Sequence, residues 1–182
     1  MKPLALVLLL LAACTPVNPP KSPEAEAKDS FRFVGGGNST TARIVDPDLL
    51  WSSLGRVQTF DDGYRGVWRD EIVDIRTREH VVEGFIGSLR TELHITPYED
   101  GYRIDGLYRG HLGQLYVTSR RIAGSVGQGW VDVTRLDGGR FGGYTNTSAG
   151  ALPRQRALSL PEQFPSLPEE RQALYLALVI GG

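Results

Sequence analysis

The strongest constraint on the fold is a two-residue alternation between apolar and polar side chains. Within residues 89–95, Leu89, Thr91, Leu93 and Ile95 alternate with Arg90, Glu92 and His94. Successive side chains of a strand point to opposite faces, so this pattern predicts a strand with one dry face and one wet face. Similar alternation, interrupted by turn residues, continues from Val81 to Thr145. We therefore expect a mainly β domain built from antiparallel hairpins.

Glycines recur at regular places in this stretch. Three segments share the pattern Gly-x-apolar-Gly: Gly84-Phe85-Ile86-Gly87, Gly110-His111-Leu112-Gly113 and Gly124-Ser125-Val126-Gly127. Glycine weakens a strand, so it usually marks a bulge, a tight bend or a close approach of two backbones. Recurring glycines predict a single curved antiparallel meander sheet or a small barrel. A phosphate-binding loop is excluded because no helix is expected after any of these glycines.

Two helices are expected beside the strands. Asp46-Pro47-Asp48 is typical of a helix start and Gly55 of a helix end, which predicts a short helix near 47–54. Ser166-Leu167-Pro168-Glu169 has the spacing of a capping box, which predicts a C-terminal helix from Leu167 to about Val179. We expect the second helix to cover one side of the sheet; the alternative is an exposed apolar tail that docks a partner or a membrane. The stretch from Arg69 to Glu79 fits either a strand or a helix.

The first fourteen residues have a different character from the rest of the chain. Lys2 is followed by the unbroken apolar run Leu4 to Ala13, which suits the apolar part of a secretory signal of roughly 7–15 residues. A membrane-spanning helix needs about 20 such residues, so a permanent transmembrane anchor is not expected. Cys14 ends the run and is the only cysteine, so no internal disulfide is possible.

Leu11-Ala12-Ala13-Cys14 resembles the lipobox of bacterial lipoproteins. The resemblance implies a signal peptide over 1–13, cleavage before Cys14, and fatty acyl chains such as palmitate on that residue. Two or three chains would anchor the protein in a membrane for long periods, because each buried methylene contributes roughly 0.8 kcal/mol. Thr15 in place of Asp favours the outer membrane. The alternative is an ordinary signal peptide with a chance cysteine.

Three segments follow from these observations: the signal peptide 1–13, a lipidated tether 14–30, and a β domain over 31–182 that ends in a helix. The tether holds four prolines and almost no apolar residues, a composition that does not form a packed core. The formal net charge of the 182 residues is −1, which gives no reason to expect a nucleic-acid partner.

No group of residues has the spacing of a reactive centre. The three histidines are interpreted as surface residues, and the acidic cluster between Asp61 and Asp74 as a solvated ion-pair face interleaved with arginines. Ser125 lacks the Gly-x-Ser-x-Gly spacing of a hydrolase nucleophile. We therefore expect no catalytic residue, no metal site and no cofactor.

Aromatic residues offer the remaining candidates for recognition. Alternation places Trp130 and Asp132 on the face opposite Val131 and Val133, so these two are the candidate binding surface. Core packing is expected for Trp51 and Trp68. The leading hypothesis is a non-catalytic outer-membrane lipoprotein that binds or scaffolds an envelope protein or glycan. The alternatives are a small-molecule or lipid carrier with a cavity in the β domain, and a cell-wall hydrolase.

Overall fold

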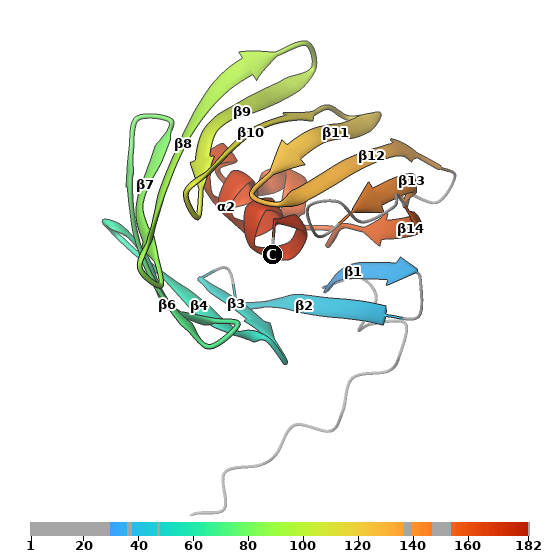
Figure 1. Ribbon diagram of the computed structural model, residues 1–182. Coiled ribbons are helices and arrows are strands. Elements are labelled where there is room, and N and C mark those ends of the chain that lie inside the picture. The colour runs from blue at the N-terminus through green and yellow to red at the C-terminus, as the bar shows by residue number, and fades with distance from the viewer. Residues whose placement is uncertain (1–29, 36–37, 47, 137–139, 147–153, 182) are drawn as a thin grey trace, which may run out of the picture.

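The computed structural model describes residues 30–35, 38–46, 48–136, 140–146 and 154–181. These residues form a closed antiparallel barrel with one helix at its centre (Figure 1). The strands are β1 (Ser30–Gly35), β2 (Asn38–Asp46), β3 (Leu49–Ser52), β4 (Gly55–Phe60), β5 (Gly63–Trp68), β6 (Glu71–Arg78), β7 (Val81–Ile86), β8 (Leu89–Tyr98), β9 (Gly101–Tyr108), β10 (His111–Val117), β11 (Arg121–Val126), β12 (Gly129–Arg135), β13 (Phe141–Asn146) and β14 (Arg154–Ser159). The helical elements are the 3-10 turn η2 (Phe164–Ser166) and the helix α2 (Glu169–Ile180).

Each strand pairs with the next strand along the chain, and β14 pairs with β1 to close the barrel. The alternation predicted from the sequence is confirmed. In β8, Leu93 and Ile95 are buried inside the barrel, whereas His94 between them is exposed. The ambiguous stretch after Arg69 is the strand β6, in which Val73 and Ile75 are buried.

The glycines allow the wall to curve. At Gly124, in the middle of β11, φ is +129° and an added Cβ would lie 2.0 Å from the carbonyl oxygen of Gln114 on β10. No side chain fits between the two backbones at that distance. Gly127 has φ of +60° in the turn that follows, a conformation that glycine adopts without strain. Of the two predicted forms, a curved meander sheet and a small barrel, the structure has the closed barrel.

The prediction of a short helix near 47–54 is wrong. Leu49–Ser52 is the strand β3, which pairs with both β2 and β4. Its burial follows the two-residue period of a strand, because Leu50 is fully buried inside the barrel and Trp51 is 49% exposed outside it. Core packing was expected for Trp51, and that expectation is also wrong; Trp68 is buried as expected.

The C-terminal helix is confirmed, but its place differs from the expected one. α2 lies inside the barrel, with strands around it (Figure 1). Every residue from Gln172 to Ile180 is buried, and eight of these nine are apolar. A helix that is apolar on all sides has to be surrounded rather than to cover one face. The expected capping box does not form, because Ser166 donates its hydroxyl to the carbonyl of Gln163 and Pro168 occupies the N-cap.

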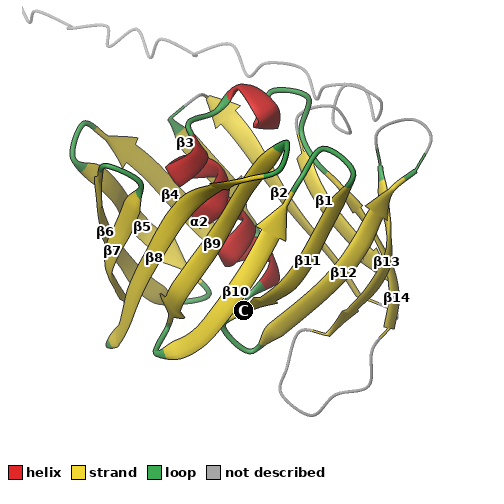
Figure 2. Ribbon diagram, turned by 90° about the horizontal axis from the view of Figure 1, so that it is seen from above, coloured by secondary structure: helices red, strands yellow, loops and turns green. Residues whose placement is uncertain are grey.

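The two ends of the barrel are defined by the direction of α2 (Figure 2). We call the end where α2 begins the entry end. Ser30, the first described residue, lies at this end, because β1 is antiparallel to β14 and its Arg32 pairs with Ser159, after which the chain runs to α2. We call the other end the exit end, where Gly181 lies against Tyr108 and Gly127. Among the described residues no helix is long and apolar enough to span a membrane.

Candidate binding sites

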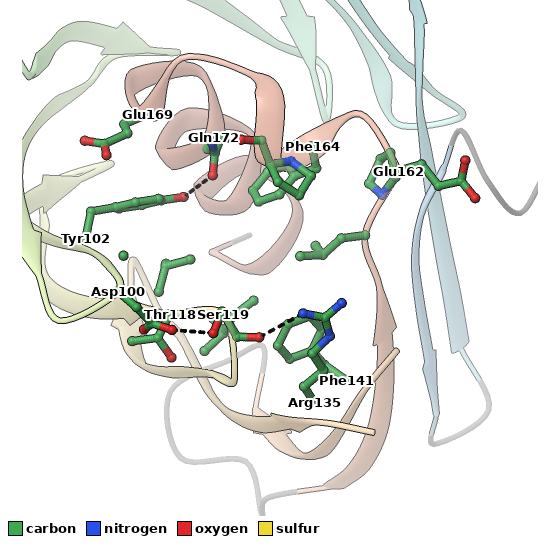
Figure 3. Close-up of a pocket in the computed structure, with 16 residues that line it drawn as sticks. Asp100, Tyr102, Thr118, Ser119, Arg135, Phe141, Glu162, Phe164, Glu169 and Gln172 are labelled. Atoms are coloured by element: carbon green, nitrogen blue, oxygen red, sulfur yellow. Dashed lines mark hydrogen bonds between the residues drawn. The ribbon is translucent and has the colours of Figure 1, made fainter. Parts of the chain in front are cut away.

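A cavity of about 550 Å³ opens at the entry end of the barrel, between α2 and the wall (Figure 3). Its floor is apolar and includes Tyr102 of β9, Ile122 of β11, Phe141 of β13 and Phe164 of η2. All four are buried, because strand alternation points the first three into the barrel and η2 folds Phe164 over them. The volume is within the range of small-molecule sites.

Polar groups at this cavity are arranged in two sets. On the α2 side, the Tyr102 hydroxyl donates to Oε1 of Gln172 at 3.0 Å, and Nε2 of Gln172 donates to the carbonyl of Leu167 at 2.7 Å. Burial raises the pKa of Tyr102, and the negative charge of Glu169 adds to that increase. The phenol is therefore neutral and fixed in place by the helix.

On the wall side, the Ser119 hydroxyl donates to the carboxylate of Asp100, and this bond lowers the pKa of Asp100. Arg135 donates from Nη1 to the carbonyl of Ser119 at 3.4 Å. Figure 3 shows these three residues on the side of the cavity opposite Glu169.

A second, more polar depression of about 390 Å³ lies near the first turn of α2 at the same end. Its lining includes Asp48, Tyr64, Glu170 and Arg171. Arg171 lies 3.4 Å from a carboxylate oxygen of Asp48, and burial raises the pKa of Tyr64 to about 12. These groups already form ion pairs or are buried, so this depression offers fewer free contacts than the larger cavity.

The outside of the wall carries a third candidate, formed by Tyr98, Tyr116, Arg121, Trp130 and Asp132. We call these five residues the outer aromatic surface. They line a depression of about 460 Å³ whose floor includes Ala123 and Gly124, where small residues leave room between the larger ones.

The geometry of the outer aromatic surface is defined by two contacts. The rings of Tyr98 and Tyr116 lie 4.8 Å apart between centroids at an interplanar angle of 58°. Arg121 donates from Nε and Nη2 to the two carboxylate oxygens of Asp132, at 2.8 and 2.9 Å. The Arg121 guanidinium lowers the pKa of Asp132, so this pair is charged at neutral pH. Trp130 is 37% exposed beside them.

The structure brings the two predicted surface residues together and adds three that the sequence did not indicate. Trp130 and Asp132 lie on the outer side of β12, as alternation predicts. Tyr98, Tyr116 and Arg121 come from β8, β10 and β11, and only the register of these strands brings them into one depression with the residues of β12. Cys14, the predicted lipidation site, lies outside the described residues.

The residues considered for other chemistry are dispersed. His80, His94 and His111 have different neighbours: Glu170, Glu92 and Gln128, respectively. In the acidic cluster, Asp62 and Asp74 both pair with Arg65. Within the described part of the chain, no three metal-ligating side chains gather as a metal site would require.

Ser125 lies on the barrel wall, between Gln114 and Trp130 of the neighbouring strands. Neither neighbour is a base that could activate a serine nucleophile.

The barrel geometry is compatible with a binding or carrier role, and it offers two candidate surfaces, the entry-end cavity and the outer aromatic surface. Comparisons with protein-family models, with curated proteins and with solved structures give no match.

Proposed function

We propose that the protein is a non-catalytic lipoprotein of the bacterial outer membrane whose outer aromatic surface binds a glycan of the cell envelope. The observation that carries the proposal is the grouping of three aromatic side chains around the Arg121–Asp132 pair. The C–H faces of a sugar ring are apolar and pack against aromatic rings, while its hydroxyl groups need hydrogen-bond partners at the edge.

The polar groups of this surface suit such a ligand. Carboxylate and guanidinium groups offer acceptors and donors in fixed directions, and a bidentate pair holds both side chains in one orientation. An exposed ion pair contributes little to stability, typically less than about 1 kcal/mol. Holding Arg121 and Asp132 in register is therefore better explained by recognition than by folding.

The anchor is proposed from the lipobox at Leu11 to Cys14. The tether would join the barrel at Ser30, on the entry end. The outer aromatic surface lies on the outside of the wall toward the entry end, where Tyr98 ends β8 and Arg121 begins β11. A barrel held by a tether at Ser30 would therefore carry this surface on its anchored half, facing sideways toward neighbouring envelope polymers.

Glycan binding is tested with the full-length protein in detergent, titrated with soluble peptidoglycan fragments and with lipopolysaccharide oligosaccharides. We expect Trp130→Ala to weaken binding at least tenfold, about 1.4 kcal/mol. Trp51→Ala is the matched control, because Trp51 is also exposed on the wall but lies on β3. Equal losses in both variants, absence of binding, or cleavage of any of the glycans would contradict the proposal.

The anchor is tested separately by Cys14→Ser. We expect this variant to move from the membrane fraction to the soluble fraction of the envelope while keeping its glycan affinity. A variant that stays in the membrane pellet would contradict the lipid anchor without affecting the glycan proposal.

A further inference from the structure

The entry-end cavity has no role in the proposed function, although it has the form of a ligand site. α2 occupies the axis of the barrel, so the cavity of about 550 Å³ lies beside the start of the helix rather than within the core. Its floor carries three aromatic residues, Tyr102, Phe141 and Phe164. Ligand sites of this size are mostly apolar with a few fixed polar groups.

Glu169 is the charged group above this floor. It begins α2, lines the cavity, and lies next to the ring of Tyr102 (Figure 3). Across the described residues, its carboxylate forms no hydrogen bond or ion pair. The next residue differs, because Glu170 accepts from the backbone N–H of His80 at 3.2 Å and lies 3.3 Å from its ring nitrogen.

The other charged groups of the cavity are engaged or directed elsewhere. Asp100 accepts from Ser119, and Arg135 donates to the Ser119 carbonyl on the far side. Figure 3 shows the carboxylate of Glu162 pointing away from the cavity. The unpaired charge on the α2 side of the cavity, next to Tyr102, is therefore negative, whereas Arg135 keeps its positive charge and further N–H donors on the far side.

A carboxylate beside an aromatic ring is a favourable setting for an ammonium ion. The carboxylate forms a charge-assisted hydrogen bond with it, and the negative face of the ring attracts the same cation. A neutral alcohol of the same shape would keep the apolar contacts and one hydrogen bond to the carboxylate, but it would lose the attraction between opposite charges and the cation–π attraction.

We propose that the entry-end cavity binds a small molecule that carries an ammonium group next to an apolar ring or chain. The ammonium group pairs with Glu169 over the Tyr102 ring, and the apolar part packs on Phe141 and Phe164. This proposal is independent of glycan binding and of the lipid anchor. The ammonium group is shared by a simple amine and by an amino acid, whose carboxylate would also reach toward Arg135.

The test uses the full-length protein in detergent and a ligand-observed NMR titration at neutral pH. The probes are phenethylamine, its neutral counterpart 2-phenylethanol, and phenylalanine. We expect phenethylamine to bind at least tenfold more tightly than 2-phenylethanol. Equal affinity for the two, or no binding of phenethylamine, would overturn the proposal.

The variants assign the preference to a residue. Glu169→Gln should abolish the difference between phenethylamine and 2-phenylethanol. Glu170→Gln is the matched control on the same turn, because Glu170 faces His80, and it should leave the difference unchanged. An unchanged preference in Glu169→Gln, with the circular dichroism spectrum preserved, would overturn the assignment.

The comparison of phenylalanine with phenethylamine distinguishes an amino-acid ligand from a simple amine. Tighter binding of phenylalanine than of phenethylamine, lost in Arg135→Gln, would support an amino-acid ligand. Weaker binding of phenylalanine would support a simple amine at the same site.

Discussion

The two ends of α2 are built differently. At the exit end the backbone of the helix touches the wall: a Cβ added at Gly129 would lie 2.4 Å from the carbonyl oxygen of Ile180, and one added at Gly127 would lie 2.6 Å from that of Gly181. At the entry end, the first turn lies between two openings of about 550 and 390 Å³. The barrel is therefore packed at one end and hollowed at the other.

The sequence of the helix explains this difference. Its first three residues, Glu169, Glu170 and Arg171, are charged and only partly buried, whereas the rest of the helix is fully buried. Burying an unpaired charge is costly, so the wall cannot close on the first turn as it closes on the last. We infer that stability comes mainly from the exit half of α2, and that the entry half is free to serve binding.

The largest effect is expected from Gly129→Ala, which tests whether the exit end is tightly packed. The added methyl group would meet the backbone of Ile180, which cannot move aside as a flexible side chain would. We expect a loss of about 3 kcal/mol in the free energy of unfolding, measured by urea denaturation. The control is Gly110→Ala, also at the exit end, where φ is +75° but no atom lies closer than 4.0 Å. It should cost only about 1 kcal/mol of backbone strain.

The next test concerns Trp68, whose Nε1 donates to the carbonyl of Leu178 at 3.0 Å. That carbonyl belongs to the last turn of α2, where carbonyls lack partners within the helix. We expect Trp68→Phe to cost about 2 kcal/mol, because a buried acceptor loses its donor. Trp51→Phe, on the exposed side of the wall, should change stability by less than about 0.5 kcal/mol. A similar loss in both variants would show that the exit end is not specially packed.

Much of the barrel could be predicted from residues that are close in sequence. The alternation around Leu93 and Ile95 depends only on the pleat of a strand. Gly124 indicates a curved strand whichever residue of the neighbouring strand it pairs with. The sequence predicted an open curved sheet or a barrel without deciding between them, because closure depends on pairs such as Arg32 of β1 with Ser159 of β14, which lie far apart in the chain. The Asp46–Asp48 signal was ambiguous because turns and helix starts favour the same residues.

The position of α2 had a signal that the sequence interpretation did not use. The run from Ala173 to Ile180 is apolar on every side, and such a helix needs walls all around it. Only part of the outer aromatic surface could be predicted from the sequence. Alternation places Trp130 and Asp132 on one face, but the contribution of Arg121 depends on the pairing of β11 with β12.

A smaller effect is expected at the entry end from Tyr102→Phe. This substitution removes the hydrogen bond to Gln172, but the Gln172 oxygen lies at the cavity, where water can replace the lost donor. We expect a cost of about 1 kcal/mol, less than for Trp68→Phe. Tyr116→Phe, which loses an exposed bond to Gln114, is the control and should cost a few tenths of a kcal/mol. A loss of stability in Tyr102→Phe that exceeds the loss in Trp68→Phe would show that the entry end, and not the exit end, contributes more to stability.

The smallest effect on stability is expected from Ser119→Ala, at the loop rim of the cavity. The Ser119 hydroxyl lowers the pKa of Asp100, so the variant should raise that pKa toward its usual value, measurable by NMR titration of the carboxyl carbon. A lowered pKa in the folded protein contributes stability above the usual carboxyl pKa of about 4, and this contribution is lost as the pH falls through the lowered value. The wild type and the variant should therefore differ slightly at neutral pH and converge in acid. Because Asp100 is exposed, the difference at neutral pH should be well below that of Tyr102→Phe. A larger loss would place the entry-end loops within the cooperative structure and remove the contrast between the two ends.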